Sequence, residues 1–372
     1  MHILVTTDTL SDVWVYTREL VSGLVSRRIR VTLVSLGEIP LPQQIEWMDR
    51  LDDLDYRPTG FRLDWMQEGD HHLTESSAFL VSLIREVKPD VLHFNHLCYG
   101  GLPVQSPRLI VAHSDLISWW KAVHGREPDP GPWWHWYRDA VLRGLLQADV
   151  VVAPSVWMLD TIRACYGVPS RGVVIYNGRN PINFNPYVAK EDSVLAVGRL
   201  WDAGKQVSLL TQHTHPLPVC IAGARTPVET VNAPIRTDVS VAVDTLRVAV
   251  KGPQTEAQLR TLYSRASIYA ATSRYESFGM AALEAALSRC AIVANDIPPF
   301  REIWGDAALY FRTNDANSLA ARVRSLSDDR PLCQAYGNRA YQRARECFTA
   351  VRMVDEYLRL YRNLLTGKRA AA

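Results

Sequence analysis

The chain has 372 residues, of which 47% are hydrophobic and 22% are charged. This length accommodates two domains of ordinary size, and the composition is typical of a soluble globular protein. The formal net charge of +2 is too balanced for a nucleic-acid-binding surface, so we expect no nucleic acid partner.

Cysteine usage and hydropathy indicate a reducing compartment. The six cysteines are scattered without C-x-x-C spacing, which is typical of free thiols. The apolar run at 3–5 is too short for a signal peptide, and no window approaches the roughly 18 apolar residues of a membrane span. We therefore expect a cytoplasmic protein with no transmembrane segment.

The first half of the chain alternates strand-like and helix-like segments. In chain order they are a strand at 3–5, a helix at 16–26, a strand at 31–36, a helix at 76–87 and strands ending near 94, 113 and 155. Alternation of this kind predicts βαβ units and a parallel sheet.

The second half repeats the pattern after a turn-rich hinge at 176–181. Strands are expected at 194–198, 219–223, 246–252, 268–271 and 291–294, and the tail at 349–365 reads as an amphipathic helix. Residues 225–245 show no clear period and are expected to form a surface loop or a short irregular helix.

The segment 274–285 (RYESFGMAALEA) is the most informative motif. It sets Glu276 and Glu284 on either side of a Phe-Gly turn that leads into a small-residue helix. Backbone N–H groups at a helix entry are unpaired and suit an anionic or hydroxylated ligand. Two carboxylates that flank such donors can hold a sugar ring and a ribose together.

The segment 198–205 (GRLWDAGK) is the second motif, a strand end followed by two cations. Arg199 supplies a planar fork and Lys205 a point charge, which suits a diphosphate. Two positioned cations can replace a metal in stabilising a leaving diphosphate. No D-x-D metal site stands at a strand end, so we expect no metal and no cofactor.

Both motifs, and the segments that flank them, resemble retaining glycosyltransferases of family 4, which have the E-x7-E motif and the GT-B fold. The resemblance covers almost the whole chain. It implies an α/β protein with two Rossmann-like domains facing an interdomain cleft. The acceptor-binding domain would span 1–178, with the last helix at 350–366 packed back on it, and the nucleotide-sugar-binding domain would span 179–349.

The resemblance implies retaining, front-face transfer of a hexose from a nucleotide sugar to an acceptor hydroxyl. UDP-glucose and GDP-mannose are the donors expected from the family. Arg199 and Lys205 would stabilise the diphosphate, and Gly252 would lie near the base. Glu276 would hold sugar hydroxyls together with the N–H groups at the helix entry (Phe278, Gly279 and Met280). Glu284 would bind the ribose.

A histidine at a strand end provides a third element. His113 follows the apolar run 109–112, and the carboxyl edge of a parallel sheet is where ligands bind. In relatives, a histidine in this kind of place contacts the transferred sugar, so His113 is expected to be catalytic. His93 and His96 are rivals from the neighbouring strand and are expected to shape the acceptor side.

The turn after the first strand departs from the family pattern. Ser11 and Asp12 stand where the family has a glycine pair, next to Trp14 on the expected acceptor side. A carboxylate aimed at a diphosphate would repel it. Either Asp12 caps the helix that begins near Val13, which we favour, or donor binding is weakened.

Aromatic residues concentrate between 118 and 138, where five tryptophans lie within 119–136. Flat rings suit stacking on a sugar or an aromatic acceptor, so Trp119 and Trp133 are expected to line the acceptor pocket. Packing within the domain is the alternative. Peripheral membrane contact stays open because tryptophan-rich surfaces also seat at membrane interfaces.

Other functions remain open on the same fold. A sugar-phosphate synthase or nucleotide-sugar epimerase is one, although a phosphorylated acceptor would need more basic residues than Arg18 alone. A non-catalytic sugar-nucleotide binder, disabled by Asp12, is another. A Rossmann dehydrogenase is disfavoured because no G-x-G-x-x-G follows the first strand.

Overall fold

The protein is described by a computed structural model that covers residues 1–66, 69–169, 171–225 and 247–369. The predicted loop or short irregular helix at 225–245 lies, except for residue 225, outside the described residues. The chain divides into two compact units. Unit 1 comprises Met1–Gly178 and the residues from Ala350 onward, and unit 2 comprises Arg179–Thr349.

Unit 1 is built on a parallel sheet with strand order β3-β2-β1-β4-β5-β6-β7 among its described residues. The strands are β1 (His2–Asp8), β2 (Arg30–Leu36), β3 (Leu54–Pro58), β4 (Val91–Phe94), β5 (Arg108–Val111), β6 (Val150–Ala153) and β7 (Gly172–Val174). The helices are α1 (Asp12–Val25), α2 (Pro42–Ile45), α3 (Gly69–Val87), α4 (Leu116–His124), α5 (Pro132–Gln147), α6 (Val156–Tyr166) and α12 (Ala350–Arg369).

The sequence analysis did not predict the two edge strands of unit 1, β3 and β7. The sequence of β3 is LDYRP and β7 has three residues, and both strands are only partly buried. The polar residues of β3 mask an apolar alternation, and β7 is too short to show a period, so periodicity reveals neither strand. The helix α1 begins at Asp12, four residues before the periodic segment 16–26 and close to the start near Val13 that the cap predicted.

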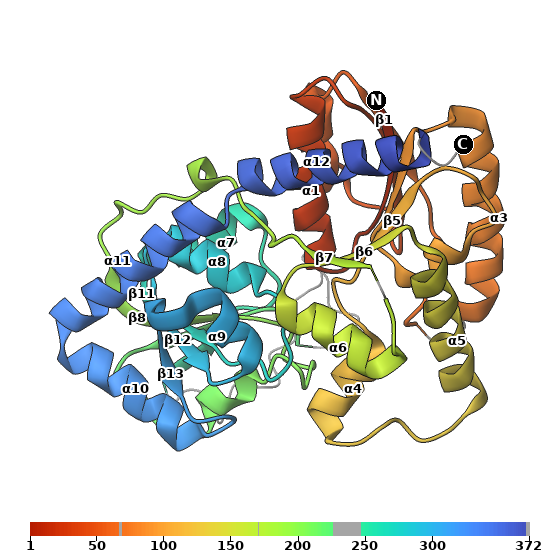
Figure 1. The fold of residues 1–372 in the computed structure, drawn as a ribbon. Coiled ribbons are helices and arrows are strands. Elements are labelled where there is room, and N and C mark those ends of the chain that lie inside the picture. The colour runs from red at the N-terminus through yellow and green to blue at the C-terminus, as the bar shows by residue number, and fades with distance from the viewer. Residues whose placement is uncertain (67–68, 170, 226–246, 370–372) are drawn as a thin grey trace. The chain divides into compact units, whose positions relative to one another are not determined.

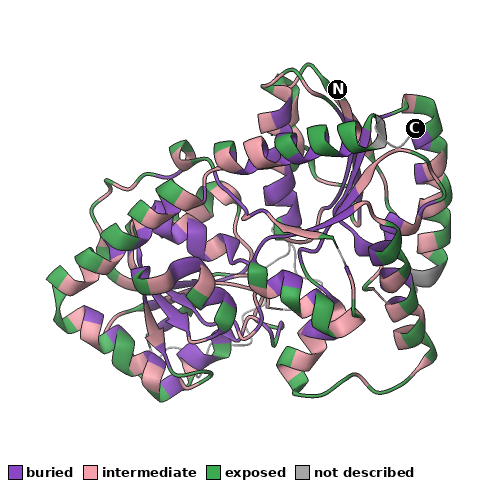
Figure 2. Cartoon of the chain, in the orientation of Figure 1, coloured by how far each residue is buried: buried purple, intermediate pink, exposed green. Residues whose placement is uncertain are grey.

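The last helix is part of the unit 1 core. Met353, Val354 and Tyr357 are buried in one cluster with Leu20 and Leu24 of α1. Gly23 permits this contact, since a Cβ built there would lie 2.5 Å from a methyl group of Val354. Figure 1 shows α12 crossing α1, and Figure 2 shows buried residues on α1 and on the strands of the sheet.

Unit 2 has the parallel strand order β10-β9-β8-β11-β12-β13 among its described residues. The strands are β8 (Glu191–Val197), β9 (Val219–Ala222), β10 (Val248–Val250), β11 (Ala266–Ala271), β12 (Ala291–Asn295) and β13 (Ala308–Phe311). The helices are α7 (Glu256–Arg265), α8 (Met280–Leu287), α9 (Pro298–Trp304), α10 (Ala316–Asp328) and α11 (Arg330–Cys347). The predicted alternation of strands and helices is confirmed in both units.

The order in which strands are added to the sheet reverses at the same point in both units. The chain moves outward from β1 to β3 and from β8 to β10, and it returns to the other side at β4 and β11. Ligands of open parallel sheets bind outside the carboxyl ends of the strands at such a switch point. Within the described residues, no helix combines the length and apolar character needed to cross a bilayer.

Candidate functional site

The two strongest sequence motifs meet at the switch point of unit 2. The segment 198–205 follows β8, and Glu276 lies in the loop that follows β11, its neighbour in the sheet. The main chains of the two loops are joined, because Arg274 N–H donates to the Gly204 carbonyl at 2.9 Å. The Thr272 hydroxyl donates to the Lys205 carbonyl, also at 2.9 Å. The fold therefore turns two motifs distant in sequence into one surface.

Lys205 and Glu276 form the centre of this surface. Lys205 Nζ lies 2.8 Å from Glu276 Oε2, and the two side chains are 21% and 12% exposed. The Ser273 hydroxyl donates to the same carboxylate oxygen at 3.3 Å. A cation and an acceptor-only carboxylate thus stand together at the strand ends, ready for a phosphate and a hydroxyl.

Asp202 shapes the loop after β8, a role that sequence analysis missed. It is 6% exposed, and its Oδ1 accepts the Gly204 N–H at 2.8 Å. Its Oδ2 lies 2.7 Å from Arg199 Nη2. The Arg199 guanidinium also lies over the Trp201 ring, 5.1 Å from its centre. Asp202 therefore stabilises the turn at Gly204 and orients the guanidinium group of Arg199.

Gly223 lets the neighbouring strand end approach this loop. Its φ of +151° is accessible to glycine and disfavoured for other residues. A Cβ built there would lie 1.9 Å from the Gly198 carbonyl oxygen. The Gly223 N–H donates to the carbonyl of Gly252 at 2.9 Å, so the ends of β9 and β10 are linked. Gly252, expected near the base, is buried and has a φ of +67°.

The entry of α8 has the conformation that its sequence predicts. Gly279 is the N-cap with φ +93° and offers no side chain to cap the first turn. The Phe278 ring is 1% exposed and packs edge-on against Phe348, which fixes the entry in place. The N–H groups of Phe278, Gly279 and Met280 are therefore at a helix entry beside Glu276, where a hydroxylated ligand can accept from them.

Glu284 has a buried partner that sequence analysis did not identify. Arg179, from the predicted hinge, is 0% exposed, and its Nε lies 3.0 Å from Glu284 Oε1. Its Nη2 lies 2.8 Å from Glu256 Oε1. Arg179 N–H donates to the Phe348 carbonyl at 3.1 Å, which ties both ends of unit 2 together. The hinge arginine thus orients the second glutamate of the motif.

In unit 1 the loop after β1 is organised by Asp8, not by Asp12. The Asp8 carboxylate is 6% exposed and accepts the N–H groups of Leu10 and Ser11 at 2.9 and 2.8 Å. It also accepts the Ser11 hydroxyl at 2.7 Å. The predicted cap was wrong by one residue, because Ser11 accepts the Val13 N–H and Asp12 is the exposed first residue of α1.

His113 lies beyond the end of β5 in a network of buried polar side chains. Asn95 Nδ2 donates to the Thr6 carbonyl at 2.7 Å, so Asn95 Oδ1 faces two imidazoles. It lies 2.9 Å from His113 Nε2 and 3.1 Å from His93 Nε2, and both nitrogens therefore carry the proton. The hydroxyl of Tyr361 from α12 then donates to His93 Nδ1 at 2.7 Å.

Burial keeps both imidazoles neutral. Desolvation, together with smaller contributions from the neighbouring His93 and His96, lowers the pKa of His113 to about 3. Desolvation also lowers the pKa of His93 to about 3, against the hydrogen bond to Asn95. His113 is 9% exposed and so still reaches the surface of unit 1 at the carboxyl edge of the sheet. Its Nε2 proton is donated to Asn95, so its Nδ1 can accept a hydrogen bond there, and the ring does not carry charge near neutral pH.

One predicted acceptor contact is corrected by burial. His93 is 0% exposed, so it supports Asn95 and does not touch an acceptor. Trp14 is 9% exposed, as His113 is, and packs edge-on against Trp47 with ring centres 6.2 Å apart, so its contact with an acceptor stays a prediction. His96 is also buried, and its Nδ1 contacts the Thr6 hydroxyl at 3.1 Å.

The aromatic segment forms α4 and the start of α5. Trp133 is half-buried and stacks on Tyr137, with ring centres 5.6 Å apart. Trp119 is half-buried too and lies 6.0 Å from the His124 ring. Asp115 caps α4 and accepts the hydroxyls of Tyr137 and Tyr166, a role that sequence analysis missed. The rings therefore pack partly on one another and remain partly exposed.

No cluster of three or more His, Cys, Asp or Glu side chains suited to a metal ion occurs in the described part of the chain. Arg199 and Lys205 are two cations at the unit 2 switch point that could hold an anionic ligand.

Two family profiles match the chain. The profile described as Glycosyltransferase Family 4 matches residues 13–181, and that described as Glycosyl transferases group 1 matches residues 205–343. The lipopolysaccharide core biosynthesis mannosyltransferase LpcC of Rhizobium leguminosarum bv. viciae is 29% identical over 60% of this chain and 66% of its own length. The alpha-maltose-1-phosphate synthase of Mycolicibacterium smegmatis is 27% identical over 73% of this chain and 76% of its own length.

Solved structures share the fold. Sucrose-phosphate synthase from Thermosynechococcus elongatus superposes with a TM-score of 0.80 at 17% identity, over 99% of this chain and 100% of that one. Anabaena Alr3699/HepE in complex with UDP-glucose superposes with a TM-score of 0.73 at 15% identity, over the whole of both chains. The predicted GT-B architecture of two Rossmann-like domains is thus confirmed.

Proposed function

The chain belongs to glycosyltransferase family 4, and on that premise we propose that it moves a hexose from a nucleoside-diphosphate sugar to an acceptor hydroxyl with retention of configuration. The observation that carries the proposal is the contact of Lys205 with Glu276, 2.8 Å apart at the unit 2 switch point. Arg199, fixed by Asp202, supplies the second cation. This set matches what a leaving diphosphate and a sugar hydroxyl require.

Each donor contact has a residue in unit 2. Arg199 and Lys205 bind the diphosphate, and Glu276 accepts hydrogen bonds from sugar hydroxyls. The N–H groups at the α8 entry donate to the same sugar. Glu284, held by Arg179, accepts from the ribose, and the turn at Gly252 lies toward the base. UDP-glucose and GDP-mannose are the first donors to test, since relatives are named for mannosyl transfer and a neighbour binds UDP-glucose.

The proposed transfer is a front-face substitution. The bond from C1 of the sugar to the phosphate oxygen breaks, and its electron pair leaves with the diphosphate. The acceptor oxygen bonds to C1 from the same face, and its proton passes to the departing phosphate oxygen. Arg199 and Lys205 stabilise the charge that develops there, so the proposed reaction needs no metal ion.

The acceptor is proposed to bind to unit 1 as an uncharged hydroxyl compound. His113 presents a neutral imidazole to it, and Trp119 and Trp133 offer aromatic edges. Trp119→Ala and Trp133→Ala are expected to raise the acceptor KM while leaving the donor KM unchanged. An acceptor KM that stays at the wild-type value in both variants would remove these rings from the proposed site.

A sugar phosphate is the second candidate acceptor, because a relative that matches 73% of this chain is an alpha-maltose-1-phosphate synthase. The loop after β1 argues against it. The buried Asp8 carboxylate already accepts the N–H groups of Leu10 and Ser11, so they are not available to an anion. A competition assay between a neutral sugar and its phosphate ester distinguishes the two acceptors.

Nucleotide release from a panel of UDP-, GDP- and ADP-sugars in EDTA tests the proposal. We expect release from one donor, reduced at least about 100-fold in Lys205→Ala and Glu276→Ala. Arg265→Ala, a cation that is 58% exposed in the same unit, is the matched control and is expected to keep full activity. Activity that vanishes in EDTA and returns with Mg²⁺ would reject metal independence, and an inverted product anomer would reject retention.

A further inference from the structure

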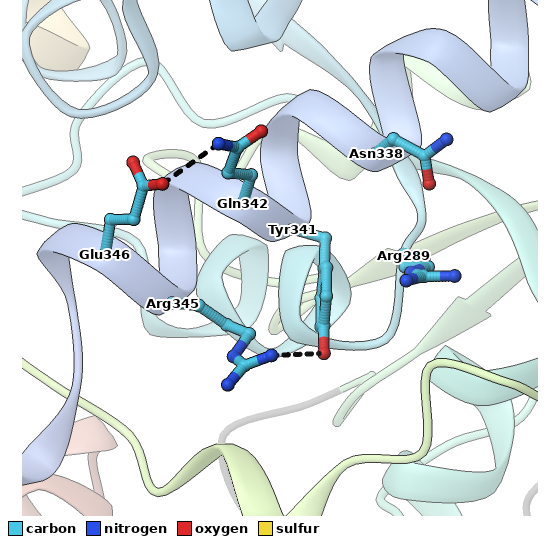
Figure 3. Close-up of a pocket in the computed structure, with 6 residues that line it drawn as sticks. All are labelled: Arg289, Asn338, Tyr341, Gln342, Arg345 and Glu346. Atoms are coloured by element: carbon cyan, nitrogen blue, oxygen red, sulfur yellow. Dashed lines mark hydrogen bonds between the residues drawn. The ribbon is translucent and has the colours of Figure 1, made fainter.

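A polar pocket lies before the start of β12, at the edge of the unit 2 sheet opposite to Glu276. Its volume is about 570 Å³, within the range of small-molecule sites. All strands of this sheet are parallel, so residues that precede β12 and residues that follow β11 lie at opposite edges. The pocket is lined by Arg289, Asn338, Tyr341, Gln342, Arg345 and Glu346 (Figure 3).

Arg289 occupies a backbone position that favours glycine. Its φ is +60°, at the turn between α8 and β12, where its N–H donates to the Ala286 carbonyl at 2.9 Å. Gly337 of α11 packs directly on this turn, since a Cβ there would lie 2.7 Å from the Arg289 carbonyl oxygen. The turn and the helix together direct the arginine side chain along the outer face of α11.

Two guanidinium groups converge on Tyr341. That of Arg289 lies 4.7 Å from the centre of the Tyr341 ring and 5.2 Å from that of Tyr187. The Arg289 Nε is buried and has no hydrogen-bond partner. Arg345 lies 5.6 Å from the same Tyr341 ring and donates to its hydroxyl at 3.3 Å.

The carboxylate in the pocket does not neutralise these cations. Glu346 accepts from Gln342 Nε2 at 3.0 Å, and Figure 3 shows the two side chains turned toward each other, away from Arg289. In the described residues, neither Arg289 nor Arg345 has an ion pair with a carboxylate. A half-buried guanidinium without an anion loses hydration that an anionic ligand would replace.

We infer that this pocket binds a phosphate group carried by a larger, hydroxyl-bearing molecule. Two arginine forks from different elements can donate to several oxygens of one tetrahedral dianion. The remaining space is lined by the amides of Asn338 and Gln342, which suit hydroxyl groups. The ligand is either a free phosphate ester such as a sugar phosphate or the headgroup of an anionic lipid. The site is separate from the proposed transfer reaction.

Line broadening of the ³¹P signal of glucose 6-phosphate, with glucose as a competitor that lacks the phosphate, tests the inference. Arg289→Gly and Arg345→Gln are each expected to raise the Kd for glucose 6-phosphate at least about tenfold. Arg289→Gly relieves the left-handed backbone, so its thermal stability is expected to match or exceed that of the wild type. Loss of binding in that variant therefore reports the side chain and not unfolding.

Two control variants separate this pocket from the donor site. Arg339→Gln removes another arginine of α11, one that lies over Tyr336, and is expected to bind normally. Lys205→Ala removes the donor-site cation and is also expected to bind normally. Binding that disappears in Lys205→Ala but persists in Arg289→Gly and Arg345→Gln would overturn the inference.

Sedimentation with phosphatidylglycerol vesicles, against phosphatidylcholine vesicles, identifies the source of the phosphate. Vesicle binding that depends on Arg289 and Arg345 assigns the site to a lipid headgroup. Binding of glucose 6-phosphate alone, with the same dependence, assigns it to a soluble ester. A wild-type protein that binds neither probe contradicts the inference.

Discussion

The Nε of Arg179 lies 3.0 Å from Oε1 of Glu284, although the arginine belongs to the hinge segment and the glutamate to α8. The arginine is fully buried and also pairs with Glu256. A fully buried cation is stable when carboxylates compensate its lost hydration. The carboxylate of Glu284 is therefore held in a fixed orientation by a buried partner.

Arg179→Ala is expected to destabilise the protein by about 3–5 kcal/mol, because two carboxylates lose their buried partner. Arg260→Ala is the matched control, since Arg260 pairs with the same Glu256 at 2.7 Å but is 36% exposed. It is expected to cost at most about 1 kcal/mol. Urea denaturation measures the free energy of unfolding of both variants. Equal decreases would show that burial does not determine how much the ion pairs of Arg179 stabilise the protein.

Gly223→Ala is expected to disrupt the loop after β8. The added Cβ would overlap the Gly198 carbonyl oxygen, and the φ of +151° disfavours alanine. We expect a drop of at least about 2 kcal/mol in the free energy of unfolding, and a raised donor KM. Gly60→Ala, where nothing lies within 4 Å of the new Cβ, is the control. Wild-type donor KM in Gly223→Ala would mean that the loop adapts without cost.

Ser11→Gly and Asp12→Gly are expected to differ in stability. Ser11 caps α1 and donates to the buried Asp8 carboxylate. Glycine is tolerated at an N-cap at a cost of only a few tenths of a kcal/mol, so the expected loss of about 1 kcal/mol comes mainly from the hydrogen bond to Asp8. Asp12 is exposed in the first helical turn, and its replacement should leave the donor KM within about twofold, because an exposed charge is screened by solvent. Thermal unfolding and donor titration measure the two effects. A large fall in donor KM for Asp12→Gly would restore the proposal that this carboxylate repels the diphosphate.

Acid is expected to destabilise unit 1 through its buried histidines. The pKa of His113 and that of His93 are lowered by burial to about 3, whereas unfolded histidines titrate near 6.5. Below pH about 6.5 these histidines bind protons in the unfolded chain but stay neutral in the folded chain. The free energy of unfolding therefore decreases as the pH falls from about 6.5 toward 3. Each histidine contributes a slope of about 1.4 kcal/mol per pH unit in that window.

Nitrogen NMR of ¹⁵N-histidine-labelled protein checks the same network without an activity assay. Both imidazoles are expected to stay neutral at pH 5, with the proton on Nε2. Tyr361→Phe removes the hydroxyl that donates to His93 Nδ1 and should change the His93 signals first. His113→Gln should reduce the slope of the unfolding free energy against pH by about 1.4 kcal/mol per pH unit, the contribution of one histidine. A His113 that titrates near pH 6.5 would contradict the buried network.

The sequence by itself determined the α/β class, the two motifs and the α8 entry. These features are local, because strand and helix periodicities, strand-end glycines and the Phe278-Gly279 turn depend on neighbouring residues alone. The family followed from the same motifs. Gly279, predicted to open the helix, is its N-cap with φ +93°.

Only the tertiary structure decided which charged and polar groups meet. Lys205 reaches Glu276 because β8 and β11 are neighbours at a switch point, and the order of strands in a sheet cannot be read from periodicity. Asn95 acquired its role in the same way, since it joins His113 to His93 and, through it, to Tyr361 of α12. Burial also reassigned His93, because an exposed and a buried histidine look alike in sequence, and only desolvation by distant residues distinguishes them.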